Sequence, residues 1–161
     1  MKIRTLSLLA SHLAIFLVGF TAGIYWLPIL TAPPPADAAR VLQAMQNGEY
    51  AGSFARDRQD SDAFHWGEGT LTLGNQTIAF DGELAPGPDY RLYLSPEFVE
   101  TEADFLRLKS QMVQVAEVKS FDRFVLPLAG DVDPGRYNTA IVWCEAFGQF
   151  ITSARYSKRP S

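Results

Sequence analysis

The feature that most constrains this chain is a long apolar stretch near its N-terminus. No charged side chain occurs between Arg4 and Asp37, and the segment Leu6–Leu30 is almost wholly apolar. A helix rises about 1.5 Å per residue, so this segment is roughly 37 Å long as a helix. The hydrocarbon core of a bilayer is about 30 Å thick. The stretch is therefore long enough to form a transmembrane helix with some tilt.

The residues at both ends of the stretch predict how it lies in a membrane. Lys2 and Arg4 precede it, and positive charges stay on the cytoplasmic side. Tyr25 and Trp26 lie near the far end, where amphipathic rings prefer the interface. Pro28 follows and is expected to end the helix. We therefore predict a single-pass membrane protein whose C-terminal domain is extracytoplasmic, that is, periplasmic or extracellular.

The alternative is a cleaved signal peptide. Ala36-Asp37-Ala38 resembles a small-residue cleavage site that follows a basic start and an apolar run. The apolar core of a signal peptide, however, has about 7–15 residues, and this stretch is far longer. An uncleaved anchor is the favoured interpretation, and both interpretations place the remaining chain outside the cytoplasm.

Composition divides the chain into four parts. Pro33–Pro35 favour an extended, semi-rigid spacer, and Ala38–Gln46 carries apolar residues at helical spacing. The expected divisions are residues 1–31 as cytoplasmic N-terminus and anchor, 32–47 as Pro-rich linker and short helix, 48–157 as a β-domain, and 158–161 as a frayed tail.

From Tyr50 onward the pattern changes from a helical period to a strand period. Apolar and polar residues alternate in short runs, and turn pairs such as Asp81-Gly82 separate them. One or two helical turns are expected after Thr101. The expected strands include 70–73, 77–80, 90–94, 112–118, 121–126, 137–144 and 149–156. Seven or eight short strands with regular turns indicate an all-β fold, either an antiparallel sandwich or a barrel-like domain.

The charge of this domain excludes one class of partner. The chain holds 14 Lys and Arg and 18 Asp and Glu. Lys2 and Arg4 precede the apolar stretch and every acidic residue follows it, so the remainder has 12 basic and 18 acidic residues, a net charge of −6. An acidic domain is a poor electrostatic match for a phosphate backbone or for anionic lipid headgroups, and nucleic-acid binding is not expected.

Few side chains of the domain have the chemistry for a functional site. It has one cysteine, Cys144, and one histidine, His65. Zinc sites need about three or four ligands, so zinc is poorly supported and the identity of any metal stays unknown. A thiolate at Cys144 could ligate haem iron or a soft metal, with His65 as the second ligand. The alternative is that Cys144 is a buried small hydrophobe and His65 an ordinary surface or half-buried histidine.

Strand geometry describes the surroundings of Cys144 further. Trp143 and Cys144 point to opposite faces, because successive side chains of a strand alternate. Both faces are apolar, so we expect a central strand buried on both sides. Cys144 ends this strand next to a turn, where a side chain can be reached from a rim.

The same strand carries a family resemblance. Tyr137, Ile141-Val142, Trp143-Cys144 and Phe147 resemble the cysteine-bearing strand of the DM-thirteen domain, which is named as an electron-transfer domain and often occurs beside DOMON domains. Further similar motifs follow the family order: Gly52-Ser53-Phe54, His65 with Gly69, Gly87-Pro88-Asp89-Tyr90-Arg91-Leu92-Tyr93-Leu94, Phe124-Val125-Leu126-Pro127 with Phe in place of Tyr, and Ala154-Arg155-Tyr156. The resemblance covers roughly Gly48 to Tyr156.

The resemblance implies a β-sandwich-like domain with Cys144 as the suspected redox centre. The cysteine would act either as a free thiol or as the ligand of a prosthetic group such as haem. No DOMON or cytochrome segment accompanies the domain in this sequence, so the expected electron partner is a separate protein. The competing hypothesis is a non-catalytic binding or structural module of the cell envelope, in which Cys144 is buried and inert.

Overall fold

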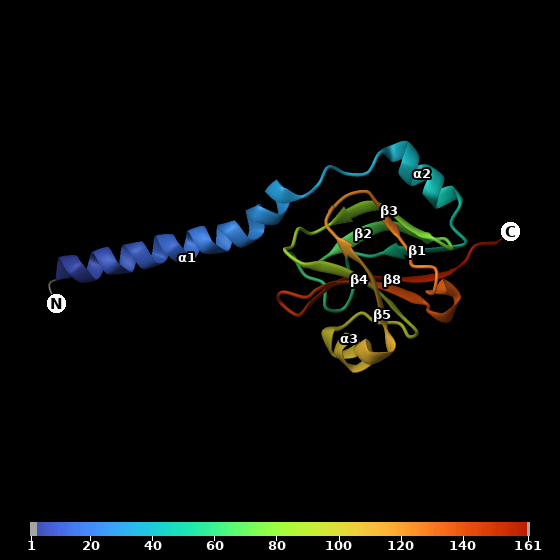
Figure 1. Cartoon of the computed structure of the whole chain (residues 1–161). Helices are drawn as coiled ribbons and strands as arrows, with labels where there is room; N and C mark the ends of the chain where they lie inside the picture. Colours follow the sequence, from blue (N-terminus) through green and yellow to red (C-terminus); the bar gives the residue numbers. More distant parts are fainter. Residues whose placement is uncertain (1–2, 161) are drawn as a thin grey trace.

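The computed structural model describes residues 3–160. Its first element, α1 (Ile3–Thr31), extends away from the β-domain (Figure 1) and is long and apolar enough to cross a membrane. The expected helix end at Pro28 is wrong, because α1 continues to Thr31. Proline has a helical φ and removes one backbone hydrogen bond. A single proline this close to a helix end is therefore tolerated within the last turns.

The strands are β1 (Tyr50–Phe54), β2 (Gly67–Leu73), β3 (Thr77–Leu84), β4 (Tyr90–Ser95), β5 (Val113–Val118), β6 (Phe124–Pro127), β7 (Thr139–Cys144) and β8 (Gln149–Lys158). All pair antiparallel, in the order β5-β4-β7-β8-β1-β2-β3-β6. The edge strands β5 and β6 come into contact, so the sheet curls into a nearly closed barrel (Figure 1). The predicted all-β, barrel-like fold of seven to eight antiparallel strands is confirmed.

Two short helices cover parts of this barrel. The predicted helix over Ala38–Gln46 is present as α2, and Asp37 caps it by accepting the N–H groups of Ala39 and Arg40. The expected turns after Thr101 form α3 (Glu102–Leu108). The Thr101 hydroxyl accepts the Asp104 N–H at 3.1 Å, so both helices begin at a capping side chain that the sequence already displays.

One predicted turn is wrong. Strand β3 runs straight through Asp81-Gly82, and Gly82 pairs with Gly69 of β2. Gly69 has a φ of 137°, which favours glycine. A Cβ at Gly82 would overlap the Glu68 carbonyl oxygen and lie 2.6 Å from the Gly69 Cα. The glycine at position 82 therefore permits a close approach of two strands and does not make a turn.

We expect Gly82→Ala to lower the free energy of unfolding by about 1–3 kcal/mol, because β2 and β3 must move to admit the methyl group. Gly74→Ala is the matched control, since a Cβ there makes only ordinary contacts, the nearest at 3.5 Å. Chemical unfolding followed by far-UV circular dichroism measures both variants. Equal unfolding midpoints for the two would contradict the close approach.

The core consists of two apolar clusters, one on each face of β7. Cys144, Ala140 and Val142 belong to the larger cluster inside the barrel. Ile141 and Trp143 belong to the smaller cluster beneath α3. All six residues of β7 are buried. The expected central strand, with Trp143 and Cys144 on opposite faces, is confirmed.

Both ends of the domain are held by backbone hydrogen bonds. The Ala36 N–H donates to the Arg123 carbonyl at 3.0 Å, which attaches the linker to the barrel just before α2. At the other end, β8 includes Lys158 and the Arg159 N–H donates to the Glu49 carbonyl at 2.8 Å. The first two residues of the predicted frayed tail are thus paired with the barrel.

Candidate functional site

Cys144 lies at the last position of β7, between β4 and β8. It pairs with Tyr90 on one side and with Gln149 on the other. The register with β8 shifts after Val142, so Ile151 is an extra residue that joins the core cluster of Cys144. Bulges of this kind often re-aim a side chain beside a functional site. The side chain of Cys144 is only 2% exposed, so the accessible rim position expected from the sequence is wrong.

A pocket of about 770 Å³ nevertheless includes Cys144 in its lining, and His65 lines the same pocket. The two side chains come from segments far apart in sequence, and the curl of the barrel brings them to one end. The lining is otherwise mainly apolar; on the barrel it includes Phe64, Pro86, Tyr90, Phe147 and Ile151, and on α1 it extends from Leu17 to Trp26. Pockets of this volume and polarity are typical of small-molecule and cofactor sites.

The protonation state of Cys144 follows from its surroundings. Burial raises the pKa of the Cys144 thiol above its ordinary value, and this effect outweighs the backbone N–H groups of Phe147, Asp89 and Ala146 that lower it. The nearby Asp89 carboxylate raises the pKa further. The unligated thiol therefore stays protonated at neutral pH. The three N–H groups favour negative charge on the sulfur, and they would stabilise a thiolate if Cys144 served as a metal ligand.

His65 is held by the carboxylate of Asp62. Both Asp62 oxygens lie 3.0 Å from His65 Nδ1, and Oδ1 also accepts the N–H groups of Phe64 and His65 at 2.7 and 2.8 Å. Partial burial raises the pKa of Asp62, but these hydrogen bonds lower it by more, so the carboxyl is ionised at neutral pH. Since a carboxylate only accepts, Nδ1 carries a proton and Nε2 of the neutral ring keeps its lone pair. Metal-binding histidines usually have such a carboxylate partner.

Tyr90 supplies another polar group to the pocket. Burial raises the pKa of Tyr90, and the neighbouring Cys144 raises it further, so the hydroxyl remains a neutral donor at physiological pH. The phenol ring lies directly on Gly87, where any Cβ would overlap it. This contact explains the glycine of the Gly87-Pro88-Asp89-Tyr90 motif, because only a residue without a Cβ lets the tyrosine ring come this close to the backbone.

The donor set of the pocket fits a haem better than a bare metal ion. Within residues 3–160, no group of three or more His, Cys, Asp or Glu side chains could hold a metal ion. Two protein donors, Cys144 and His65, suffice for iron whose other ligands come from a macrocycle. The pocket also provides about 770 Å³ of mainly apolar space, a histidine held by Asp62, and N–H groups near the sulfur.

Together these features define a class of protein: a small antiparallel β-barrel with a single buried cysteine beside an apolar pocket. The sequence model of the electron transfer DM13 family matches residues 57–156. The chain belongs to this family, and the matched region includes both His65 and Cys144. No curated protein and no solved structure matches the chain.

The sequence does not identify several residues of the site. Phe64 and Ile151 line the pocket, and Asp62 binds His65 from outside the lining; Phe147 is present in the family motif but not as a pocket residue. The spacing Asp62-x-x-His65 is a local signal that could have indicated the carboxylate partner, because an Asp three residues before a histidine can reach its ring. Ile151 left no such signal, since its position depends on the register shift with β7.

Proposed function

We propose that this chain is a membrane-tethered electron-transfer module in which Cys144 and His65 hold a haem-type group. Residues 1–31 would anchor it, and 48–157 would form the electron-transfer domain outside the cytoplasm. The observation that carries the proposal is that the only cysteine and the only histidine of the domain line one apolar pocket. Membership of the electron transfer DM13 family supports the same activity.

The geometry favours a ligand role for Cys144 over a free redox thiol. A redox thiol reacts as its thiolate and must be reached by a second sulfur. Cys144 is 2% exposed and its pKa is raised, so it meets neither condition. A ligand, in contrast, benefits from burial and from the surrounding N–H groups. When bound, a haem iron would supply one-electron chemistry by alternating between two oxidation states.

Within this proposal each side chain has a separate task. Cys144 would bind through its sulfur and His65 through Nε2, while Asp62 orients the imidazole ring. The apolar walls would exclude water and so influence the reduction potential. The electron partner would be a separate membrane-bound protein, because the pocket lies at the end of the barrel that faces α1.

An absorbance spectrum of the purified full chain in detergent, before and after reduction, tests the proposal. We expect a Soret band that shifts on reduction, loss of the band in Cys144→Ala, and a shifted or weakened band in His65→Ala. His12→Ala is the matched control, because His12 lies on α1 and bonds only its own helix through the Leu8 carbonyl. A bare protein spectrum for the wild type, prepared with haem supplied during expression, would refute the haem site.

A second candidate is a binding or structural module with an inert cysteine, and the near-complete burial of Cys144 favours it. Since Cys144 is the only cysteine, alkylation of the whole protein reports on this thiol alone. The second candidate predicts negligible labelling of the folded protein, full labelling in denaturant, and a bare spectrum. The haem proposal predicts slow labelling together with a chromophore, so the two measurements in combination separate the candidates.

A further inference from the structure

The end of the barrel that carries the pocket also carries two exposed phenylalanines. Phe64 is 67% exposed and Phe147 is 54% exposed, and both line the pocket together with α1. Among the described residues outside α1, only Leu42 and Leu106 are large apolar side chains with similar exposure. These two lie on α2 and α3, away from the pocket. Paired apolar side chains at one rim, next to a membrane-length helix, indicate a surface that is covered in the working protein.

The length of α1 relates this rim to the depth of a bilayer. At about 1.5 Å per residue, the helix from Ile3 to Thr31 is roughly 43 Å long and exceeds a bilayer core of about 30 Å. About 20 residues cross the core, and 20 residues counted from Leu6 end at Tyr25. The pocket is lined by the turns of α1 from Leu17 to Trp26. By this count Leu17 is the twelfth of the 20 residues and Tyr25 is the last, so the α1 side of the pocket lies in the outer half of the hydrocarbon core, and the barrel rim that shares the pocket lies against its outer boundary.

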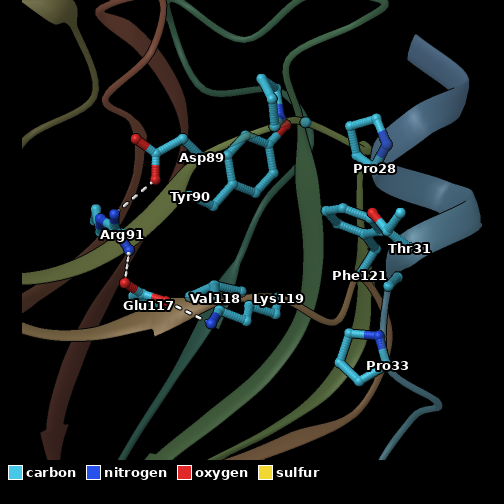
Figure 2. A pocket seen from close by; sticks show the side chains of 13 residues that line it. Pro28, Thr31, Pro33, Asp89, Tyr90, Arg91, Glu117, Val118, Lys119 and Phe121 are labelled. Carbon is cyan, nitrogen blue, oxygen red and sulfur yellow. Dashed lines mark ion pairs between the residues drawn. The ribbon is translucent and has the colours of Figure 1, made fainter. Parts of the chain in front are cut away.

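One side of the end of α1 lies next to the barrel. Ile24 and Pro28, and Ala32 just beyond the helix, are half-buried among exposed neighbours, a spacing of four that marks one side of a helix. Figure 2 shows Pro28, Thr31 and Pro33 on the same side of a second pocket as Phe121, with Arg91 and Glu117 on the other side. The charges near this contact are paired: Arg91 Nη2 lies 2.8 Å from Asp89 Oδ1, and Arg91 Nη1 lies 2.7 Å from Glu117 Oε1. These pairs reduce the cost of placing the surface near lipid.

The linker keeps the barrel close to the helix end. Because Ala36 is hydrogen-bonded to Arg123, only four residues, Ala32 to Pro35, are free between α1 and the barrel. The five steps from Thr31 to Ala36 span at most about 18 Å, and consecutive prolines limit the freedom of this segment further. The barrel thus has little room to leave the membrane surface or to turn its pocket away.

We propose that the loops carrying Phe64 and Phe147 insert into the outer interface of the membrane that α1 spans. The pocket of Cys144 then opens toward lipid and not toward bulk water. This inference rests on the membrane anchoring given under the proposed function, but it is independent of any haem. The occupant of the rim is the lipid bilayer itself, at the level of its headgroups and upper acyl chains.

Tryptophan substitutions in the full chain, reconstituted in vesicles of phosphatidylcholine, test this docking. Phe64→Trp and Phe147→Trp place a fluorophore at the rim, and Leu106→Trp and Leu42→Trp place one at equally exposed positions elsewhere. Each is compared in vesicles with and without acyl-chain bromine, which quenches nearby tryptophan. We expect loss of most of the added emission for the two rim variants, with a blue shift, and no loss for the two controls.

The emission of Trp26, taken as the difference between the wild type and Trp26→Phe because Trp66 and Trp143 also emit, separates this inference from the anchoring. If Trp26 is quenched and the protein resists alkaline extraction while the rim variants behave like the controls, α1 is inserted and the docking is refuted. If Trp26 is not quenched and the protein is extracted, the anchoring fails and the docking fails with it. Quenching of all four added tryptophans would indicate non-specific adsorption of the barrel. This result would also refute docking through the loops that carry Phe64 and Phe147.

Discussion

We expect Trp143→Ala to lower the free energy of unfolding by about 3–5 kcal/mol, the usual cost of deleting a large buried aromatic side chain. The indole ring stacks on Phe105 with ring centroids 3.9 Å apart and an interplanar angle of 8°. Phe105 in turn meets Tyr93 edge-on at 5.1 Å. Removal of the indole leaves a cavity between β7 and α3. The loss is large because the total free energy of unfolding of a single domain is only about 5–15 kcal/mol.

Two controls make this result specific. Trp143→Phe retains an aromatic ring against Phe105 and should lose clearly less stability. Leu106→Ala changes the same helix at a position that is 62% exposed, and its effect should stay within about 0.5 kcal/mol. Unfolding midpoints from far-UV circular dichroism provide the comparison. A cost below about 1 kcal/mol for Trp143→Ala would show that the smaller cluster contributes little to the fold.

The second large effect is a loss of stability in alkali. Burial raises the pKa of both Tyr90 and Tyr156 far above the ordinary tyrosine value. In the unfolded chain these groups ionise near pH 10, while in the folded barrel they remain protonated. Their contribution to the free energy of unfolding is complete below pH 10. It is lost as the pH rises above 10, because the tyrosines of the unfolded chain release their protons first.

The expected size follows from the linkage relation. At pH 11, one unit above the unfolded pKa, each tyrosine lowers the free energy of unfolding by about 1.4 kcal/mol, so the two together lower it by about 3 kcal/mol. Tyr90→Phe should flatten the decline between pH 9 and 11 by about half of that amount. Urea unfolding of the wild type and of Tyr90→Phe at a series of pH values measures this decline in stability. A midpoint that does not change from pH 8 to pH 11 would refute the assignment of these two groups as buried and neutral.

Local patterns were sufficient to predict most of the fold. The alternation in 112–118 comes from side chains that face the barrel interior or solvent in turn, and this period is visible in a single strand. The continuous apolar run in 137–144 marks a strand that is buried on both faces. The helix over Ala38–Gln46 likewise depends on its own capping residue and spacing. Asp81-Gly82 was misread because the role of Gly82 is set by Gly69 on the neighbouring strand, which a local pattern does not contain.

The candidate site was predictable only in part. The sequence singles out Cys144 and His65 as the only residues of their kind in the domain, and a family motif includes them. Their meeting in one pocket depends on closure of the barrel, a long-range event that no local pattern encodes. The sequence left Cys144 either open at a strand end or buried as a small hydrophobe. Local pattern does not decide between them, because the burial comes from a core cluster that Cys144 shares with Tyr90 and Ile151 of neighbouring strands.

The hydrogen bond between Ala36 and Arg123 has a consequence for how an electron partner would be found. With α1 inserted as proposed, four free residues confine the barrel to a thin layer of volume above the lipid. A short tether of this kind gives an effective concentration in the millimolar range for partners within its reach. For partners beyond its reach, the effective concentration falls almost to zero. Encounters would then occur by lateral diffusion in the plane of the membrane, and their frequency would depend on the surface density of the partner instead of its concentration in solution.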